Sequence, residues 1–284
     1  MNGLSRGLFE ALLTNELQSK LEGLDGSLIP AISELQPAEA ADRLALHISK
    51  HLQRAVESMN QQRRVELGVA LATKIINLLQ VDGYGDIAEA DAPHMSASVL
   101  RAILARMPDG SPETIPLPAT PLFDTTLLTN APGEPRLQHQ IQTEIPSSTR
   151  IDVLMAFVRQ TGIRTLLDPI RKHVNEGRRI RLLTTTYTGS TELEALKQLS
   201  DAGAEVRVSY DTSSTRLHAK AWLFHRDSGY STAFIGSSNL THSAQVTGLE
   251  WNVRVSGARN PDVIDKFSAV FDTYWASDDF IGAV

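Results

Sequence analysis

The chain has 284 residues, of which 42% are hydrophobic and 21% charged, a composition typical of a globular protein with a sizeable core. It contains no cysteine, which excludes disulfides, thiolate metal sites and a cysteine nucleophile. The formal net charge of −6 gives no indication of a polyanionic partner. Because neither a signal peptide nor an apolar run of ~20 residues occurs, we expect a cytoplasmic protein without a membrane partner.

The first hundred residues predict helices. Leucines recur at three- and four-residue steps over Leu8–Leu21, which places them on one face of a helix. Pro37 suits the first turn of a second helix, and further helices are predicted over Val65–Leu79 and Ser98–Met107. Four amphipathic helices favour a small bundle, so we expect residues 1–107 to be a helical N-terminal segment.

The pattern changes at residue 108. Seven prolines fall within 108–136, and this stretch is predicted to be a linker or an extended arm, because proline removes backbone donors. After it, residues 137–284 alternate apolar strands with helical stretches, which predicts an α/β domain with a parallel or mixed sheet flanked by helices. The predicted strands are Ile151–Phe157, Arg178–Thr184, Ala204–Ser209, Leu217–Phe224 and Thr232–Ile235, with a helix over Ile163–Val174.

Basic residues gather between Arg150 and Arg181, with few acidic residues among them. We interpret them as a solvated helix face plus a turn, with a polyanion-binding surface as the alternative.

The stretch Leu217–Leu223 carries the first chemical signal. Alternate side chains of a strand share a face, so His218, Lys220 and Trp222 are predicted to point one way and the small apolar residues the other. An imidazole and an ammonium side by side repel each other unless an anion lies between them, and phosphate is a natural candidate. Trp222 either packs beside this site or stacks on a base, whereas Trp251 and Trp275 are interpreted as core residues.

A second signal follows the next predicted strand. Gly236 permits close backbone approach, and Ser237, Ser238 and Asn239 offer neutral hydrogen-bond donors. Glu250 comes eleven residues after Asn239, and a carboxylate there would hold a histidine in one tautomer or form an ordinary ion pair.

The order His218-x-Lys220, Gly236-Ser237-x-Asn239 and then Glu250 resembles the signature of the phospholipase D superfamily. The resemblance covers about 138–275 and implies the mixed α/β fold of that superfamily. The leading helical segment and the run SSNLTHSAQVTGLEWNVRVS are most similar to the nuclease-like domain at the N-terminus of certain bacterial superfamily 2 DNA helicases. No Walker A sequence occurs, so a helicase motor would have to lie beyond Val284.

The resemblance also implies a mechanism. His218 would attack phosphorus and form a phosphohistidine, while Lys220 and Asn239 would hold the non-bridging oxygens. Ser237 and Ser238 would add donors, and Glu250 would orient a histidine. No cluster of metal ligands occurs in the motif, so neither metal nor cofactor is expected.

A general acid must protonate the leaving oxygen, and this chain contains a single H-x-K motif. Single-motif members of the superfamily form homodimers in which the two motifs meet at a two-fold axis, so the resemblance implies a homodimer. One departure stands out: the superfamily usually has an aspartate five residues after the lysine, and here that position is His225.

We therefore expect a metal-independent phosphodiesterase acting on DNA, with RNA as an alternative substrate. The missing aspartate favours a second hypothesis, in which the domain is a weakly catalytic or non-catalytic nucleic-acid-binding module of a helicase. Phospholipid hydrolysis is a third hypothesis, and the lack of a basic amphipathic stretch argues against it.

Overall fold

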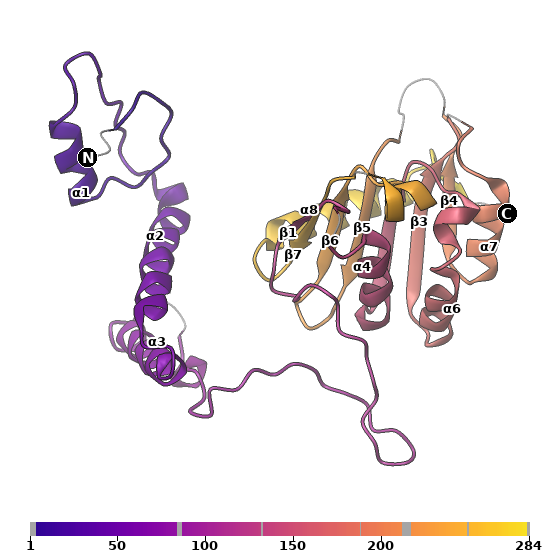
Figure 1. Cartoon of the computed structure of the whole chain (residues 1–284), viewed down its shortest axis with the longest axis horizontal. Coiled ribbons are helices and arrows are strands. Elements are labelled where there is room, and N and C mark those ends of the chain that lie inside the picture. The colour runs from indigo at the N-terminus through magenta and orange to yellow at the C-terminus, as the bar shows by residue number, and fades with distance from the viewer. Residues whose placement is uncertain are drawn as a thin grey trace. The chain divides into compact units, whose positions relative to one another are not determined.

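The computed structural model describes residues 4–83, 87–131, 133–187, 189–211, 217–248 and 250–282. The chain forms two compact units, Met1–Ile103 and Leu104–Val284, which we describe separately (Figure 1).

The N-terminal unit contains three α-helices and one short 3-10 helix among its described residues: α1 (Asn15–Glu22), α2 (Pro37–Ser58), α3 (Arg64–Val81) and η1 (Glu89–Asp91). Pro37 occupies the first turn of α2, as predicted. The first helix starts later than its leucine spacing predicts, because the Thr14 hydroxyl caps it by accepting the N–H of Leu17 at 3.2 Å.

Two other predictions for this unit are wrong. The stretch 98–107 is not helical and instead ends in a β-bridge between Arg106 and Pro112. None of the three described α-helices of this unit has a buried residue, so they do not form a bundle with a core of its own. Periodicity alone does not stabilise a short helix in water, since most helical stability in proteins comes from packing.

The C-terminal unit is built on one sheet of eight strands in the order β1-β7-β6-β5-β2-β3-β4-β8. Strands β2, β3 and β4 run parallel, and every other neighbouring pair is antiparallel. This confirms the predicted mixed α/β fold. The bounds are β1 (Thr126–Leu128), β2 (Arg150–Met155), β3 (Arg179–Thr185), β4 (Glu205–Ser209), β5 (Lys220–His225), β6 (Thr232–Gly236), β7 (Asn252–Ser256) and β8 (Ile281–Gly282).

Helices cover both faces of this sheet (Figure 1). One face carries the main core, to which Val153, Leu182 and Phe224 contribute from the strands. On the other face α8 buries Phe271 against Leu154. The helices are α4 (Leu137–Glu144), η2 (Ile145–Ser147), α5 (Gln160–Ile163), α6 (Leu167–Asn175), α7 (Leu193–Asp201), the π-helix η3 (Ser243–Thr247) and α8 (Pro261–Ala276).

The stretch predicted as a linker contributes to the sheet. Strand β1 lies within 108–136 and pairs antiparallel with β7, with Leu127 opposite Val253. Buried Arg254 on β7 explains how the arm is held, because its guanidinium donates to the carbonyl oxygens of Pro121 and Asp124, both at 2.9 Å. The helices of the described residues include none that is both long and apolar enough to cross a membrane.

Candidate active site

The predicted site residues come from three chain segments, and these meet the end of β2 at one end of the sheet. Strand β5 is antiparallel to both of its neighbours, and its first residue, Lys220, lies opposite Met155, the last residue of β2. The end of β6 lies beside the start of β7, with Gly236 opposite Asn252. The residues that follow β2 and β6 therefore lie at the same end of the sheet as the residues that precede β5 and β7.

His218 and Lys220 are in direct contact there. The Lys220 Nζ lies 2.9 Å from Nδ1 and 3.1 Å from Nε2 of His218, and it also donates to the His218 carbonyl oxygen at 2.7 Å. An ammonium only donates, and a neutral imidazole has a lone pair on one ring nitrogen, so one of these two nitrogens accepts the bond, depending on the tautomer. His218 is exposed, whereas Lys220 is 8% exposed. The imidazole is thus open to a substrate, with the cation held beneath it.

The strand begins three residues later than its sequence pattern predicts, at Lys220 instead of Leu217. Residues 217–219 are non-strand backbone, so the expected sharing of one strand face by His218 and Lys220 does not explain their contact. The long Lys220 side chain instead turns back to His218, two residues before the strand.

Burial lowers the pKa of Lys220 from its ordinary value, and the nearby carboxylate of Glu250 opposes this shift. Removing an ammonium from water disfavours its charged form, and an opposite charge restores part of the loss. Glu250 therefore acts electrostatically on the cation of this site.

Phe157 connects His218 to Asn239, and sequence analysis did not identify it as a site residue. Its ring meets the His218 ring edge-on at 5.9 Å between centroids. Its backbone N–H donates to Oδ1 of Asn239 at 3.1 Å. Because only an oxygen can accept that N–H, the amide orientation of Asn239 is fixed and its Nδ2 donors remain for another partner. The position of Phe157, just after a buried strand that ends at the site, was its only sequence signal.

Ser237 and Glu250 form the opposite side of the site. The Ser237 hydroxyl donates to Oε2 of Glu250 and accepts the N–H of Trp251 at 3.1 Å. Among the described residues Glu250 has no hydrogen bond to a histidine of its own chain. Its predicted role in orienting a histidine stays a prediction, and its observed partner is Ser237.

Ser238 and Trp222 are buried rather than open to a substrate. Ser238 is 4% exposed, and its hydroxyl accepts the amide Nδ2 of Asn252 at 2.7 Å. Trp222 is 5% exposed and stacks on Phe224 in the core, with 5.7 Å between the ring centroids. Burial favours the packing alternative for Trp222, because both faces of this central strand are covered.

Trp251 departs from expectation in the other direction. We interpreted it as core from the sequence, but it is 64% exposed and lies directly before β7, next to Glu250. The structure brings an open aromatic ring to the site where sequence reasoning placed a buried one. Trp275, also expected in the core, packs against Phe271 in a stacked geometry with 5.9 Å between centroids.

His225, which stands where the superfamily has an aspartate, is not part of the site. It ends strand β5, roughly 16 Å from Lys220 at the usual rise per residue. Its Nε2 lies 2.7 Å from Oδ2 of Asp152 on β2. Asp152 is fully buried and also pairs with Arg181, whose Nε and Nη2 lie 2.6 and 2.9 Å from its two oxygens.

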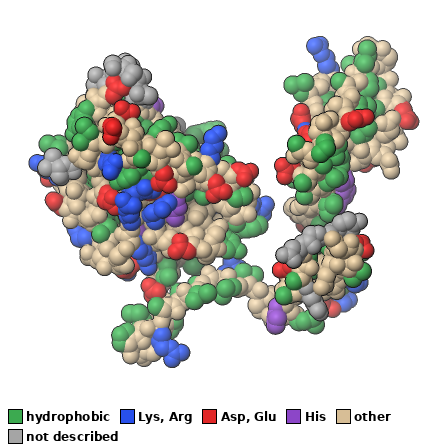
Figure 2. All heavy atoms as spheres, turned by 180° about the vertical axis from the view of Figure 1, so that it is seen from behind, with side chains coloured by type: hydrophobic (Ala, Val, Ile, Leu, Met, Phe, Trp, Pro, Cys, Tyr) green, Lys and Arg blue, Asp and Glu red, His purple; other side chains and the backbone are tan. Residues whose placement is uncertain are grey.

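The basic cluster between Arg150 and Arg181 is largely neutralised. Its ion pairs are Arg150–Asp152, Arg171–Asp168, Lys172–Glu176, Arg178–Glu176, Arg179–Glu205, and Arg181 with Asp152 and Asp272. Figure 2 shows acidic side chains among the basic ones on the face that it views. Paired cations attract a polyanion weakly, so the ion pairs favour the interpretation of this cluster as a solvated face.

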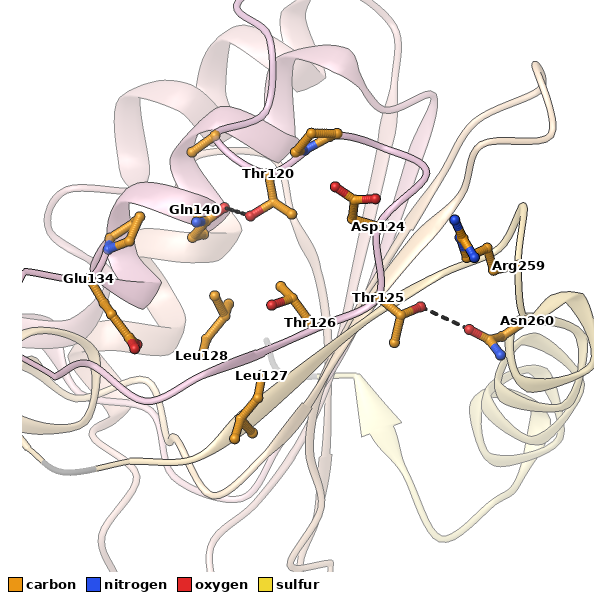
Figure 3. Close-up of a pocket in the computed structure, with 13 residues that line it drawn as sticks. Thr120, Asp124, Thr125, Thr126, Leu127, Leu128, Glu134, Gln140, Arg259 and Asn260 are labelled. Atoms are coloured by element: carbon orange, nitrogen blue, oxygen red, sulfur yellow. Dashed lines mark hydrogen bonds between the residues drawn. The ribbon is translucent and has the colours of Figure 1, made fainter. Parts of the chain in front are cut away.

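A polar hollow of about 1000 Å³ lies elsewhere, beside β1 (Figure 3). Thr120 donates to Gln140 across it at 3.3 Å, and Thr125 donates to Asn260 at 2.8 Å. Asp124 and Glu134 also line it, and none of the site residues predicted from the sequence does. We therefore place the candidate active site at the strand ends around His218. The described residues contain no group of three His, Asp or Glu side chains arranged to hold a metal ion.

Residues 141–275 match the family described as "Cardiolipin synthase, PLD-like domain". The match covers slightly less than half of this chain. Its sheet and helices are similar to Nuc, a phospholipase D family member from Salmonella typhimurium, at 15% identity, covering 56% of this chain and 98% of Nuc with a TM-score of 0.44. NucT from Helicobacter pylori is similar at 13% identity, covering 56% of this chain and 98% of NucT with a TM-score of 0.43. No curated relative matches the chain.

Proposed function

We propose that the phospholipase D-like domain is a metal-independent phosphodiesterase that cleaves nucleic acid through a phosphohistidine on His218. The observation that carries this proposal is the contact of the exposed His218 imidazole with the buried Lys220 ammonium at 2.9–3.1 Å. Asn239 adds neutral donors beside this pair. Such a group suits a phosphodiester, whose phosphorus accepts a nucleophile while its non-bridging oxygens gain charge.

The reaction has two displacements. A ring nitrogen of His218 forms a bond to phosphorus, the bond from phosphorus to the leaving oxygen breaks, and that oxygen takes a proton from a general acid. Water then attacks the phosphorus of the phosphohistidine, gives its proton to the same group acting as a base, and releases His218. Lys220 and the Nδ2 of Asn239 hold the non-bridging oxygens in both steps.

The general acid comes from a second copy of the chain in this proposal. The described contacts of His218 include no second histidine, and His225 is tied to Asp152 at the far end of β5. In-line displacement requires the acid on the side of phosphorus opposite the nucleophile. A two-fold dimer with the His218 residues near the axis supplies it.

Nucleic acid is the proposed substrate because the site carries an open aromatic ring. Trp251 is 64% exposed beside Ser237 and Glu250, and an exposed ring at a phosphate site stacks on bases without regard to sequence. A helicase motor on the same polypeptide stays a prediction from the sequence resemblance.

The binding-module hypothesis loses its main support in this structure. It rested on the missing motif aspartate, and His225 lies roughly 16 Å along the strand from Lys220. Having histidine instead of aspartate at position 225 therefore removes no group that would contact the substrate phosphate at His218.

The test measures cleavage of a single-stranded oligonucleotide with excess EDTA present. His218→Asn should reduce the rate by at least about a thousandfold while the oligonucleotide Kd, measured by fluorescence anisotropy, changes little. His139→Asn, at an exposed position on α4, is the matched control and should keep wild-type activity. Loss of activity in EDTA with rescue by Mg²⁺, or cleavage by His218→Asn at the wild-type rate, would refute the mechanism. Tight binding without cleavage by the wild type would establish the binding module instead.

A further inference from the structure

Resting on the proposed function, we infer that Arg159 binds the phosphate next to the scissile one and so makes the site selective for a nucleic-acid strand over an isolated phosphodiester. Four observations carry this assignment. They are the course of the backbone after β2, its anchoring to the loop after β6 that carries Asn239 (the Asn239 loop), the exposure of the guanidinium, and its lack of an acidic partner.

The backbone over residues 157–159 is extended and runs alongside the Asn239 loop. Leu240 N donates to the Phe157 carbonyl at 3.1 Å, and Arg159 N donates to the Leu240 carbonyl at 2.9 Å, which is the pattern of a parallel bridge centred on Val158. Arg159 itself has φ −124° and ψ 151°. Side chains two residues apart in such a segment share a face.

That face is the face of the active site. Phe157 directs its ring at His218, while Val158 is fully buried in the main core on the other side. Arg159 therefore projects on the same side as Phe157, roughly 7 Å further along the chain. The Arg159 guanidinium therefore lies near His218, but too far along the chain to bind the phosphate that His218 attacks.

The position is rigid because α5 packs directly on the Asn239 loop. A Cβ at Gly162 would lie 2.1 Å from the Leu240 carbonyl oxygen, so only glycine permits this approach. The N–H of Gln160 donates to Glu192 at 2.8 Å, which fixes the turn directly after Arg159. The backbone of Arg159 is thus anchored to the same loop that presents Asn239.

The charge of Arg159 is available. Arg159 is exposed and forms no ion pair with any described residue, whereas most of the basic residues between Arg150 and Arg181 do. Glu192, a nearby acid, receives the N–H of Gln160 rather than the guanidinium. A guanidinium also binds two phosphate oxygens at once, which suits a backbone phosphate.

The consequence is a substrate preference. A nucleic-acid strand carries a further phosphate on each side of the scissile one, whereas bis(p-nitrophenyl) phosphate carries a single phosphate. Arg159 contributes to binding only in the first case. Its contribution also depends on salt, because binding a strand phosphate releases a condensed counterion.

The experiment compares wild type with Arg159→Gln on two substrates, a single-stranded oligonucleotide and bis(p-nitrophenyl) phosphate. We expect kcat/KM for the oligonucleotide to fall about tenfold, mainly through KM, and the loss on the small diester to be several times smaller. The slope of log(kcat/KM) against log[salt] should become shallower by about 0.7 for the oligonucleotide. Arg159→Lys, which keeps the charge, should recover much of the loss.

Arg171→Gln is the matched control, since it removes the same charge from an exposed residue that is paired with Asp168 on α6. Equal losses on both substrates, or the same oligonucleotide loss in Arg171→Gln, would overturn the assignment. If the wild type cleaves neither substrate, the proposed function fails separately. Oligonucleotide Kd values of His218→Asn with and without Arg159→Gln then still test Arg159: a weaker Kd supports the assignment and an equal Kd overturns it.

Discussion

The His225 Nε2 lies 2.7 Å from Oδ2 of Asp152, across the antiparallel pair of strands β5 and β2. The superfamily motif places a carboxylate on the strand of the histidine and lysine, and this chain has an imidazole there. The carboxylate is present one strand away, on β2, where it also receives the guanidinium of Arg181. At this end of β5, far from Lys220, the carboxylate beside position 225 therefore comes from the neighbouring strand β2.

Asp152→Asn should destabilise the C-terminal unit by about 3 kcal/mol, because it removes the fully buried carboxylate that pairs with Arg181 and leaves that guanidinium only the half-exposed Asp272. Urea unfolding followed by circular dichroism measures this change. Asp168→Asn is the control and should change the free energy of unfolding by under ~0.5 kcal/mol, since Asp168 is exposed. Equal effects of the two substitutions would contradict the role of Asp152.

The destabilisation should depend on pH. Burial raises the pKa of Asp152, but hydrogen bonds from His225 and Arg181 outweigh it, so the pKa lies below the usual value. A carboxyl with a depressed pKa contributes stability above its unfolded pKa of about 3.9 and loses it as pH falls through the folded value. The difference between wild type and Asp152→Asn should therefore shrink as pH falls below about 4.

His225→Asn should lower stability yet leave catalysis close to wild type. The substitution weakens the contact with Asp152, but His225 is the last residue of β5 and Lys220 is the first, so position 225 lies at the far end of the strand from the site. Steady-state cleavage well below the unfolding temperature should give a kcat/KM within about threefold of wild type. A loss of a hundredfold with an intact fold would mean that His225 takes part in the reaction.

Glu250→Gln should move the alkaline limb of kcat/KM to lower pH. Burial lowers the pKa of Lys220 and the Glu250 carboxylate opposes this shift, so its removal lowers the pKa further. Because the ammonium form of Lys220 stabilises the transition state, activity is lost as pH rises through that pKa. A pH profile from 6 to 10 in wild type, Glu250→Gln and the exposed control Glu194→Gln measures it. An unmoved limb in Glu250→Gln would exclude the electrostatic coupling.

Mixed dimers test the second histidine. A dimer with one wild-type chain and one His218→Asn chain should have far less than half of wild-type activity, because each site needs both histidines. Isolation with two affinity tags and an oligonucleotide assay would measure this. Half of wild-type activity would mean that each chain supplies its own acid. The exposed His242, three residues after Asn239, is then the residue to replace.

The sequence by itself determined the alternation of strands and helices after residue 137 and the pairing of His218 with Lys220. The alternation follows from short-range spacing, since buried strands have continuous apolar runs. The spacing also brought His218 and Lys220 together, although their contact arises because the Lys220 side chain turns back to His218 and not from a shared strand face. The match of the Gly236–Asn239 turn to a known motif order also required no coordinates.

Only the tertiary structure decided which of these residues share the site. Phe157 joins it because β2 ends beside the start of β5, and strand pairing is a long-range property that local sequence does not encode. The surroundings of two tryptophans were decided in the same way. Trp222 is buried, the packing alternative, because helices cover both faces of β5, whereas Trp251, expected in the core, is exposed because it precedes a strand near the edge of the sheet. The stretch 98–107, predicted as a helix, is exposed throughout and not helical, since spacing alone does not stabilise a short helix without packing. The Asp152 carboxylate beside position 225 could not be predicted from the sequence, because Asp152 and His225 are 73 positions apart and meet only through the pairing of β2 with β5.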